Sequence, residues 1–203
     1  MVGGGAVGTR KAQTLLKCGA TVRVVSREIA DRLKTLAETL PLTLEQRDYR
    51  EEDLAGIFLV FGATDNEALN RRIAEDAERR GLLVNIADRP EACNFVLPSV
   101  VHRGDLTLSI STSGKSPAFA RKLRKDLEKQ FGEEYAGFLD LMGRIRARLL
   151  AEAHAPEKHK ALFGALIEGH LLELTASGDI RKIDALLTEV LGDTFTYEAL
   201  MAD

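Results

Sequence analysis

Three glycines near the start of the chain have the spacing of a dinucleotide-binding turn. Gly3, Gly5 and Gly8 fit the pattern G-x-G-x-x-G. In such a turn the first glycine allows a tight bend, the second lets the backbone approach a pyrophosphate, and the third allows close packing of helix on strand. The N–H groups at the start of the next helix then bind the phosphates. The pattern alone is weak, because glycine clusters also form ordinary turns.

The residues that would bind the ribose of such a cofactor follow about 20 positions later, at the end of the second strand. Ser26 and Arg27 stand there, with Glu28 next. A carboxylate such as Glu28 can bind ribose hydroxyls, whereas an arginine can accept the 2′-phosphate of NADP. These residues therefore do not choose between NAD and NADP.

Asp88 is the candidate for proton transfer. It follows a buried strand and precedes Arg89 and Pro90. A carboxylate at a strand end can act as a general base if burial raises its pKa. A single aspartate before a turn more often caps the local backbone, so both interpretations stay open.

The segment from Thr112 to Ser116 gathers hydroxyl groups and a lysine before a basic helix. Ser116 is placed to cap that helix, with Pro117 in its first position. Ser113 and Lys115 resemble the end of a P-loop, but Ser109 stands where a P-loop needs its first glycine. We favour an anion-binding turn for carboxylates, to which Arg121 can contribute. A plain capped turn remains the alternative.

Alternating strands and helices are expected to position these residues. Apolar and β-branched runs predict strands at 21–25, 42–47, 57–61 and 82–86, with helices at 6–18, about 28–40 and 64–81. Thr64 opens the last of these with a capping box, followed by Asp65. The pattern predicts an α/β fold with a Rossmann-like, doubly wound parallel sheet. Residues 3–8, 26–28, 62–66 and 85–89 should then surround one crevice at the carboxyl ends of the strands.

The pattern changes after residue 90. Two strands are predicted at 95–101 and 106–111, then a basic helix to about residue 131 and helices with apolar stripes. We expect a nucleotide-binding domain at 1–90, a central segment at 91–132 and a helical C-terminal domain at 133–203.

Composition excludes some classes of function. The chain has 203 residues and a net charge of -3, which suggests neither nucleic acid nor an anionic membrane as a partner. No apolar run approaches the roughly 18 residues of a membrane span. Cys18 and Cys93 form no C-x-x-C, as expected for a reducing cytoplasm. The histidines have no metal-ligand spacing, and His154 and His159 are expected at the surface.

Five short segments together resemble one family, that of the precorrin-2 dehydrogenases and sirohydrochlorin ferrochelatases, which form a module of sirohaem synthase. They are VGGGAVGTRK at 2–11, ATD at 63–65, NIAD at 85–88, FVLPS at 95–99 and STSGKSP at 111–117. The resemblance covers nearly all of residues 2–130 and is weaker beyond. Without a methyltransferase module, the chain resembles the stand-alone form. The resemblance implies NAD-dependent oxidation of precorrin-2 to sirohydrochlorin; some relatives also insert Fe²⁺.

The resemblance also implies roles for single residues. Ala6 and Val7, with Arg27 and Glu28, match positions that contact the cofactor. Asp88 matches an essential carboxylate. Thr112 stands where some relatives have a functional serine, and it keeps the hydroxyl group. Arg89, Lys115, Ser116 and Arg121 could bind the carboxylates of the tetrapyrrole. A homodimer is implied, with the segment after residue 90 forming the interface.

One alternative function and one oddity remain. A Rossmann module that senses a nucleotide and reports to a partner would need only the glycine turn, and it would leave Asp88 unexplained. Only Met1 and Val2 precede the turn, where a strand of about five residues is usual. Relatives have a longer segment there, so we expect Met1 to be a misplaced start.

Overall fold

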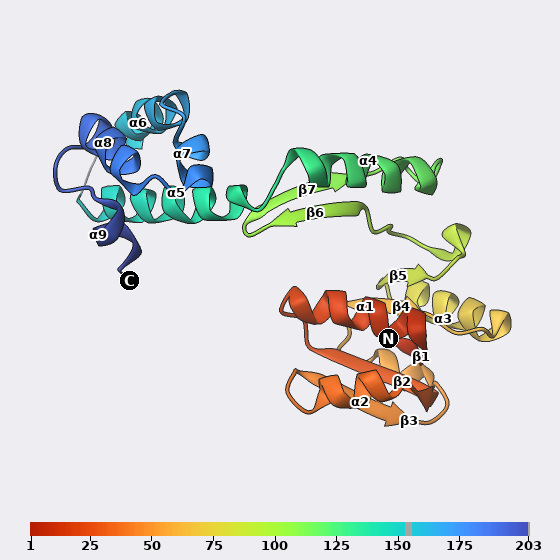
Figure 1. Cartoon of the computed structure of the whole chain (residues 1–203). Coiled ribbons are helices and arrows are strands. Elements are labelled where there is room, and N and C mark those ends of the chain that lie inside the picture. Colours follow the sequence, from red (N-terminus) through yellow and green to blue (C-terminus); the bar gives the residue numbers. More distant parts are fainter. Residues whose placement is uncertain (153–155, 203) are drawn as a thin grey trace. The chain divides into compact units, whose positions relative to one another are not determined.

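The computed structural model describes residues 1–152 and 156–202, which form two compact units (Figure 1). The units are Met1–Leu97 and Pro98–Asp203. Residues 91–97, expected in the central segment, thus belong to the first unit. The hairpin, the basic helix and the C-terminal helices share the second unit, whereas a boundary was predicted near residue 132.

The first unit is built on a five-stranded parallel sheet with the order β3-β2-β1-β4-β5, which confirms the predicted Rossmann-like fold. The strands are β1 (Val2–Gly4), β2 (Val22–Ile29), β3 (Leu42–Gln46), β4 (Leu59–Gly62) and β5 (Leu83–Ile86). The short β1 lies in the middle of the sheet. It is paired on both sides, because Val2 aligns with Val25 of β2 and with Gly62 of β4.

Helices cover both faces of this sheet. They are α1 (Ala6–Lys17), α2 (Asp31–Ala37) and α3 (Glu67–Arg79), with short 3₁₀ turns η1 (Glu51–Leu54) and η2 (Pro90–Ala92). Ala12 of α1 and Leu33 of α2 pack with Val24 in one core. Ile73 of α3 packs with Val60 in a second core on the other face. Alternate side chains of each strand point to opposite faces, so the two cores follow from the strand pattern.

Three predicted boundaries in or next to this unit were wrong. β2 continues to Ile29 and α2 begins at Asp31, not near residue 28, because Ala30 N donates to Gly4 O at 2.9 Å and keeps this segment extended. β6 begins at Ser99, not at residue 95, because Asn94 is bonded to β5 instead: its Oδ1 accepts from Val84 N at 2.7 Å. The cap of α3 is Asn66, not Thr64, since Asn66 Oδ1 accepts from Leu69 N.

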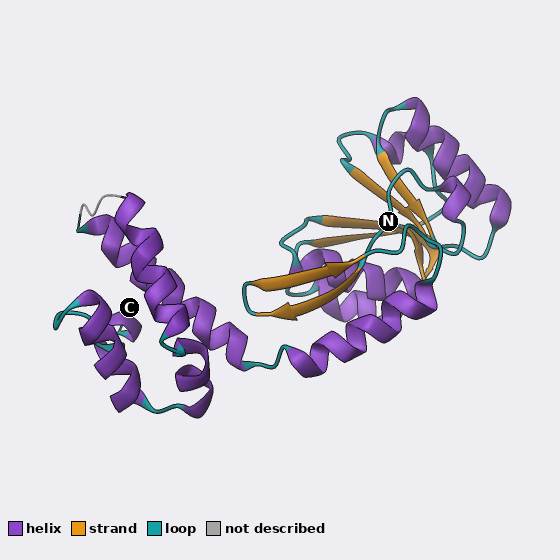
Figure 2. Ribbon diagram, turned by 90° about the horizontal axis from the view of Figure 1, so that it is seen from above, coloured by secondary structure: helices purple, strands orange, loops and turns teal. Residues whose placement is uncertain are grey.

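The second unit combines a hairpin with helices (Figure 2). The antiparallel strands β6 (Ser99–Arg103) and β7 (Leu106–Ile110) pack against α4 (Pro117–Gln130) through Val101, Ile110 and Ala120. The remaining helices are α5 (Glu134–Ala151), α6 (Pro156–Glu168), α7 (Leu171–Ser177), α8 (Ile180–Leu191) and α9 (Tyr197–Met201). Leu141, Ile145 and Leu187 are fully buried in their shared core, as the apolar stripes predicted.

Two histidines of this unit, His154 and His159, were expected at the surface. His159 is buried, so its expected position at the surface was wrong. His154 lies outside the described residues. Within residues 1–152 and 156–202, no helix is both long enough and apolar enough to cross a membrane.

Candidate dinucleotide site

The carboxyl ends of the strands in the first unit surround a cleft of about 940 Å³. The cleft is lined by most of the residues predicted to bind a cofactor: Gly3, Gly5, Ala6, Val7, Ser26, Arg27, Glu28, Thr64 and Asp65. Asp88 lines it as well. Of the predicted cofactor residues only Gly8 does not line the cleft. The predicted crevice is therefore present, and its walls come from β1, β2, β4 and β5.

The three motif glycines meet three different constraints. Gly3 has φ +107°, and a Cβ there would lie 2.3 Å from Ala63 O. A Cβ on Gly8 would lie 2.1 Å from Gly3 O, so Gly8 lets α1 pack against the turn. A Cβ on Gly5 would meet nothing within 4 Å. Gly5 faces open space in the cleft, where a ligand rather than the protein would need a glycine.

The start of α1 is suited to a pyrophosphate. Its N-cap, Gly5, has no side chain to bond the first N–H groups, and the first turn has no acidic residue. The free N–H groups and the positive end of the helix dipole both favour an anion. An anion here would thus lie beside the Cβ-free face of Gly5.

The cleft is also lined by residues at the end of a third strand, which the sequence prediction did not assign to it. Arg47, Asp48 and Tyr49 line the cleft after β3. The rule that ligands bind at the carboxyl ends of strands, applied to the strand predicted at 42–47, would have found them. Arg27 and Asp48 form an exposed ion pair at 3.5 Å, which links the ends of β2 and β3 but adds little stability.

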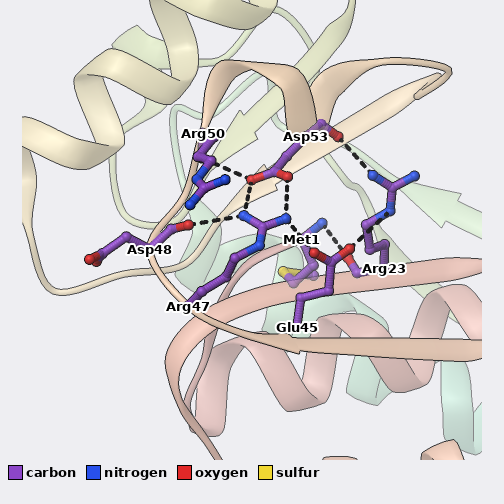
Figure 3. A network of polar contacts seen from close by, with 7 residues as sticks. All are labelled: Met1, Arg23, Glu45, Arg47, Asp48, Arg50 and Asp53. Carbon is purple, nitrogen blue, oxygen red and sulfur yellow. Dashed lines mark hydrogen bonds and ion pairs between the residues drawn. The ribbon is translucent and has the colours of Figure 1, made fainter.

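Arg47 is held by carboxylates of its own neighbourhood (Figure 3). Its two terminal nitrogens donate to both oxygens of Asp53, at 2.9 and 2.6 Å, and one of them also contacts Glu45. The hydrogen bonds from Arg47 are the main reason that the pKa of Asp53 is lowered, and the backbone N–H of Arg50 adds to this effect. The guanidinium of Arg47 is therefore engaged in the fold rather than free for a ligand.

Tyr49 and the loop after β4 are fixed in a similar way. Tyr49 is buried, and its hydroxyl donates to Asp76 Oδ2 at 3.0 Å; burial and this contact raise the pKa of Tyr49. Thr64 Oγ1 donates to Asn70 Oδ1 at 2.8 Å, and Asn70 Nδ2 donates back to Thr64 O. These bonds to α3 hold two walls of the cleft in place.

Asp88 has an unusual backbone and an exposed carboxylate. Its φ is +59°, in the left-handed region that few non-glycine residues adopt. Its side chain is exposed and makes no hydrogen bond or ion pair with any described residue, so the capping alternative is not found. Strained backbone of this kind is often found at functional sites. Arg89 does not line the cleft and pairs with Glu67 at 3.0 Å.

The segment that was predicted to bind an anion forms a capped turn in the second unit. Ser116 Oγ accepts from Phe119 N, and Thr112 Oγ1 accepts from Ser116 N at 3.2 Å. Ser113 has φ +51°. Lys115 and Arg121 are exposed and form no ion pair with any residue that the structure describes. Two basic side chains are thus available for an anion. Among the described residues no group of three His, Cys, Asp or Glu side chains could hold a metal ion.

Comparison with known protein families gives two matches. Residues 1–99 match a family described as putative NAD(P)-binding. Residues 103–130 match the family described as sirohaem biosynthesis protein central. The first match covers the sheet and the cleft. The second match covers β7 and α4, together with the end of β6 and the turn that follows it. A nicotinamide cofactor is therefore supported for the cleft, without a choice between NAD and NADP.

Comparison with individual proteins extends the likeness over nearly the whole chain. The sirohaem synthase of Pseudomonas fluorescens is 33% identical over 97% of this chain. That of Photorhabdus laumondii is 32% identical over 94%. The chain spans only 42% and 41% of the length of these relatives. A solved structure of SirC, a precorrin-2 dehydrogenase, is similar with a TM-score of 0.78 and 24% identity, covering 93% of this chain and 91% of that one. This last likeness concerns the fold.

Proposed function

Because this chain belongs to the family of sirohaem biosynthesis proteins, we propose that it oxidises precorrin-2 to sirohydrochlorin with NAD⁺ as hydride acceptor. The observation that carries the proposal is Asp88: an exposed carboxylate on left-handed backbone that lines the dinucleotide cleft. A nucleotide-sensing module would give no reason for such a residue. The relatives named above are biosynthetic enzymes, and this also argues against that alternative.

The charge of the cleft favours NAD over NADP. Four carboxylates line it, those of Glu28, Asp48, Asp65 and Asp88. Only two guanidinium groups oppose them, and that of Arg47 is engaged by Asp53 and Glu45. A 2′-phosphate near the end of β2 would lie in this negative surrounding, and its binding would be unfavourable. Glu28 would instead accept hydrogen bonds from the ribose hydroxyls.

The reaction removes two hydrogens from the macrocycle. When bound, the nicotinamide supplies the hydride acceptor. One hydrogen leaves as hydride, and the second leaves as a proton, which the Asp88 carboxylate would accept and pass to solvent. The products are therefore sirohydrochlorin, NADH and H⁺. The glycine turn and the start of α1 would hold the pyrophosphate and so set the position of the cofactor. The oxidation needs no further catalytic group, because it extends the conjugated system of the macrocycle and the product is thereby stabilised.

The remaining parts of the proposal concern binding of the substrate and assembly. In the second unit, Thr112, Ser113, Lys115, Ser116 and Arg121 would bind carboxylates of precorrin-2. Arg89 is a separate candidate in the first unit, where it pairs with Glu67. The chain would act as a homodimer in the cytoplasm, with the segment after residue 90 at the dimer interface. We do not extend the proposal to insertion of Fe²⁺, because no observation on the described residues favours it.

The test is a pair of aspartate variants. Asp88→Asn keeps the shape of the side chain but cannot accept the proton, so we expect oxidation of precorrin-2 to fall by at least about a hundredfold. Binding of NAD⁺, measured by calorimetry, should stay within about twofold of wild type. Asp105→Asn, at an exposed position of the hairpin turn, is the matched control and should oxidise normally. Turnover by Asp88→Asn at the wild-type rate would refute the role of Asp88.

A further inference from the structure

Lys11 is a partly buried lysine that does not line the dinucleotide cleft. Lys11 lies in the second turn of α1, and its Nζ donates to Asn85 Oδ1 at 3.0 Å. The ammonium also lies 4.9 Å from the centroid of the Phe61 ring. Phe61 and Asn85 are aligned neighbours on β4 and β5, so their side chains share one face of the sheet. The ammonium is thereby fixed over that face, near the carboxyl end of β5.

The orientation of Asn85 fixes the position of the lysine. Asn85 is buried, and its Nδ2 donates to Phe95 O at 3.2 Å. With the amide nitrogen directed at that carbonyl, the amide oxygen must face Lys11. Phe95 also packs edge-on against Phe61 with the ring centroids 5.8 Å apart. The segment after β5 thus supports both groups that contact the ammonium.

The ammonium keeps capacity for another acceptor. A lysine has three N–H donors, and Asn85 is the only acceptor that Lys11 meets among the described residues. Its side chain is partly exposed. Burial lowers the pKa of Lys11, and the neighbouring Arg10 lowers it further, while Cys93 and Asp88 oppose this effect. Asp88 stands three residues after Asn85, just beyond the end of β5, and it forms no ion pair with Lys11.

The location separates Lys11 from the cofactor. Asp88 lines the dinucleotide cleft, whereas Lys11 and Asn85 are absent from its described lining. An acidic group bound at Lys11 would therefore be adjacent to Asp88 without occupying the cleft. This is the position that a second, anionic reactant requires if Asp88 is to accept its proton.

We propose that Lys11 binds a carboxylate of the acidic tetrapyrrole next to Asp88, and that Asn85 positions the lysine for this contact. The inference rests on the proposed function, since it takes the substrate class from there. The contact would be a charge-assisted hydrogen bond in a partly buried place, where such bonds are strong. Lys11 is then a substrate-binding residue and Asn85 a positioning residue.

The test measures binding and turnover separately. Equilibrium binding of sirohydrochlorin, followed by its absorbance without any nucleotide, is compared for wild type, Lys11→Gln and Lys17→Gln. Lys17 is an exposed lysine in the last turn of the same helix and is the matched control. We expect Lys11→Gln to bind roughly tenfold more weakly, with NAD⁺ affinity and melting temperature unchanged, and Lys17→Gln to bind as wild type.

Salt and a second variant distinguish a bound ligand from a structural role. Added salt should weaken binding by wild type more than by Lys11→Gln, because the variant lacks the charge that salt screens. Asn85→Ala should weaken binding less than Lys11→Gln, since the ammonium remains but is no longer held. Equal affinity of wild type and Lys11→Gln, or no binding by either, would overturn the inference. Absence of precorrin-2 oxidation by a wild type that still binds sirohydrochlorin through Lys11 would instead refute the proposed function alone.

Discussion

Two glycines of the same motif should fail in different ways when they are replaced. In Gly8→Ala the new Cβ would lie 2.1 Å from Gly3 O. An ordinary carbon–oxygen contact needs more than 3 Å, so α1 and the turn would have to separate by roughly 1 Å. Forced overpacking of this kind costs about 1–3 kcal/mol of unfolding free energy. For a unit of under 100 residues, that lowers the melting temperature by roughly 5–20 °C.

Replacing Gly5 should leave the fold intact. A Cβ there meets nothing within 4 Å, and the backbone at φ -80° and ψ -165° suits any residue. Serine is also at least as good an N-cap as glycine. Gly5→Ser should therefore melt within about 2 °C of wild type. Its side chain, however, enters the space where the pyrophosphate would approach, and its hydroxyl competes for the free N–H groups of α1. We expect NAD⁺ affinity to fall by about tenfold or more.

The assay is thermal unfolding by circular dichroism, combined with calorimetric titration of NAD⁺ on the same samples. Wild-type stability of Gly8→Ala would refute the packing argument. A melting temperature of Gly5→Ser as low as that of Gly8→Ala would refute the assignment of separate roles. Unchanged NAD⁺ affinity of Gly5→Ser would show that the pyrophosphate lies elsewhere.

Two further predictions follow from the charges around the cleft. The pKa of Asp53 is lowered by Arg47, so this pair stabilises the fold fully above the unfolded-state pKa of about 3.9, and the contribution is lost as the pH falls toward the lower folded-state value. At pH 7 the free energy of unfolding of Asp53→Asn should thus be lower than that of wild type by roughly 1.5–3 kcal/mol. Between about pH 5 and pH 2 the variant should lose less stability than wild type, as urea unfolding would measure. Parallel curves of unfolding free energy against pH for the two proteins would contradict this. Glu28→Gln should reduce the ratio of kcat/KM for NAD⁺ to kcat/KM for NADP⁺ by roughly tenfold. Glu38 is exposed after α2, and Glu38→Gln, the control, should leave this ratio unchanged. An unchanged ratio in Glu28→Gln would refute the role of Glu28.

Local patterns predicted most of the elements. The apolar runs located β3, β4 and β5 to within about two residues, the accuracy expected of such boundaries. Gly19 was expected to end α1, and it follows the end of that helix with φ +79°. Ser116 and Pro117 were expected to start α4, and they do. Each of these features depends on residues close together in the chain, which is why the sequence is enough to predict them.

The features that were missed depend on contacts between distant segments. The length of β2 follows from the bond between Ala30 N and Gly4 O, and no propensity reveals such a bond. Lys11 and Asn85 lie 74 positions apart, and the lysine could be linked to Asp88 only in three dimensions. The exposed carboxylate of Asp88 also differs from the buried base that the sequence suggested. Strand ends could be assigned to one crevice from topology, but side-chain partners could not.

The most direct measurement of the proposed activity is to mix the protein with precorrin-2 and NAD⁺ in the absence of air, and to follow NADH and sirohydrochlorin by their absorbance. The account predicts that the two products form at equal rates and in equal amounts, that both fail to form when NAD⁺ is left out, and that neither forms with Asp88→Asn. Binding of NAD⁺ by the wild-type protein without any oxidation of precorrin-2 would contradict it.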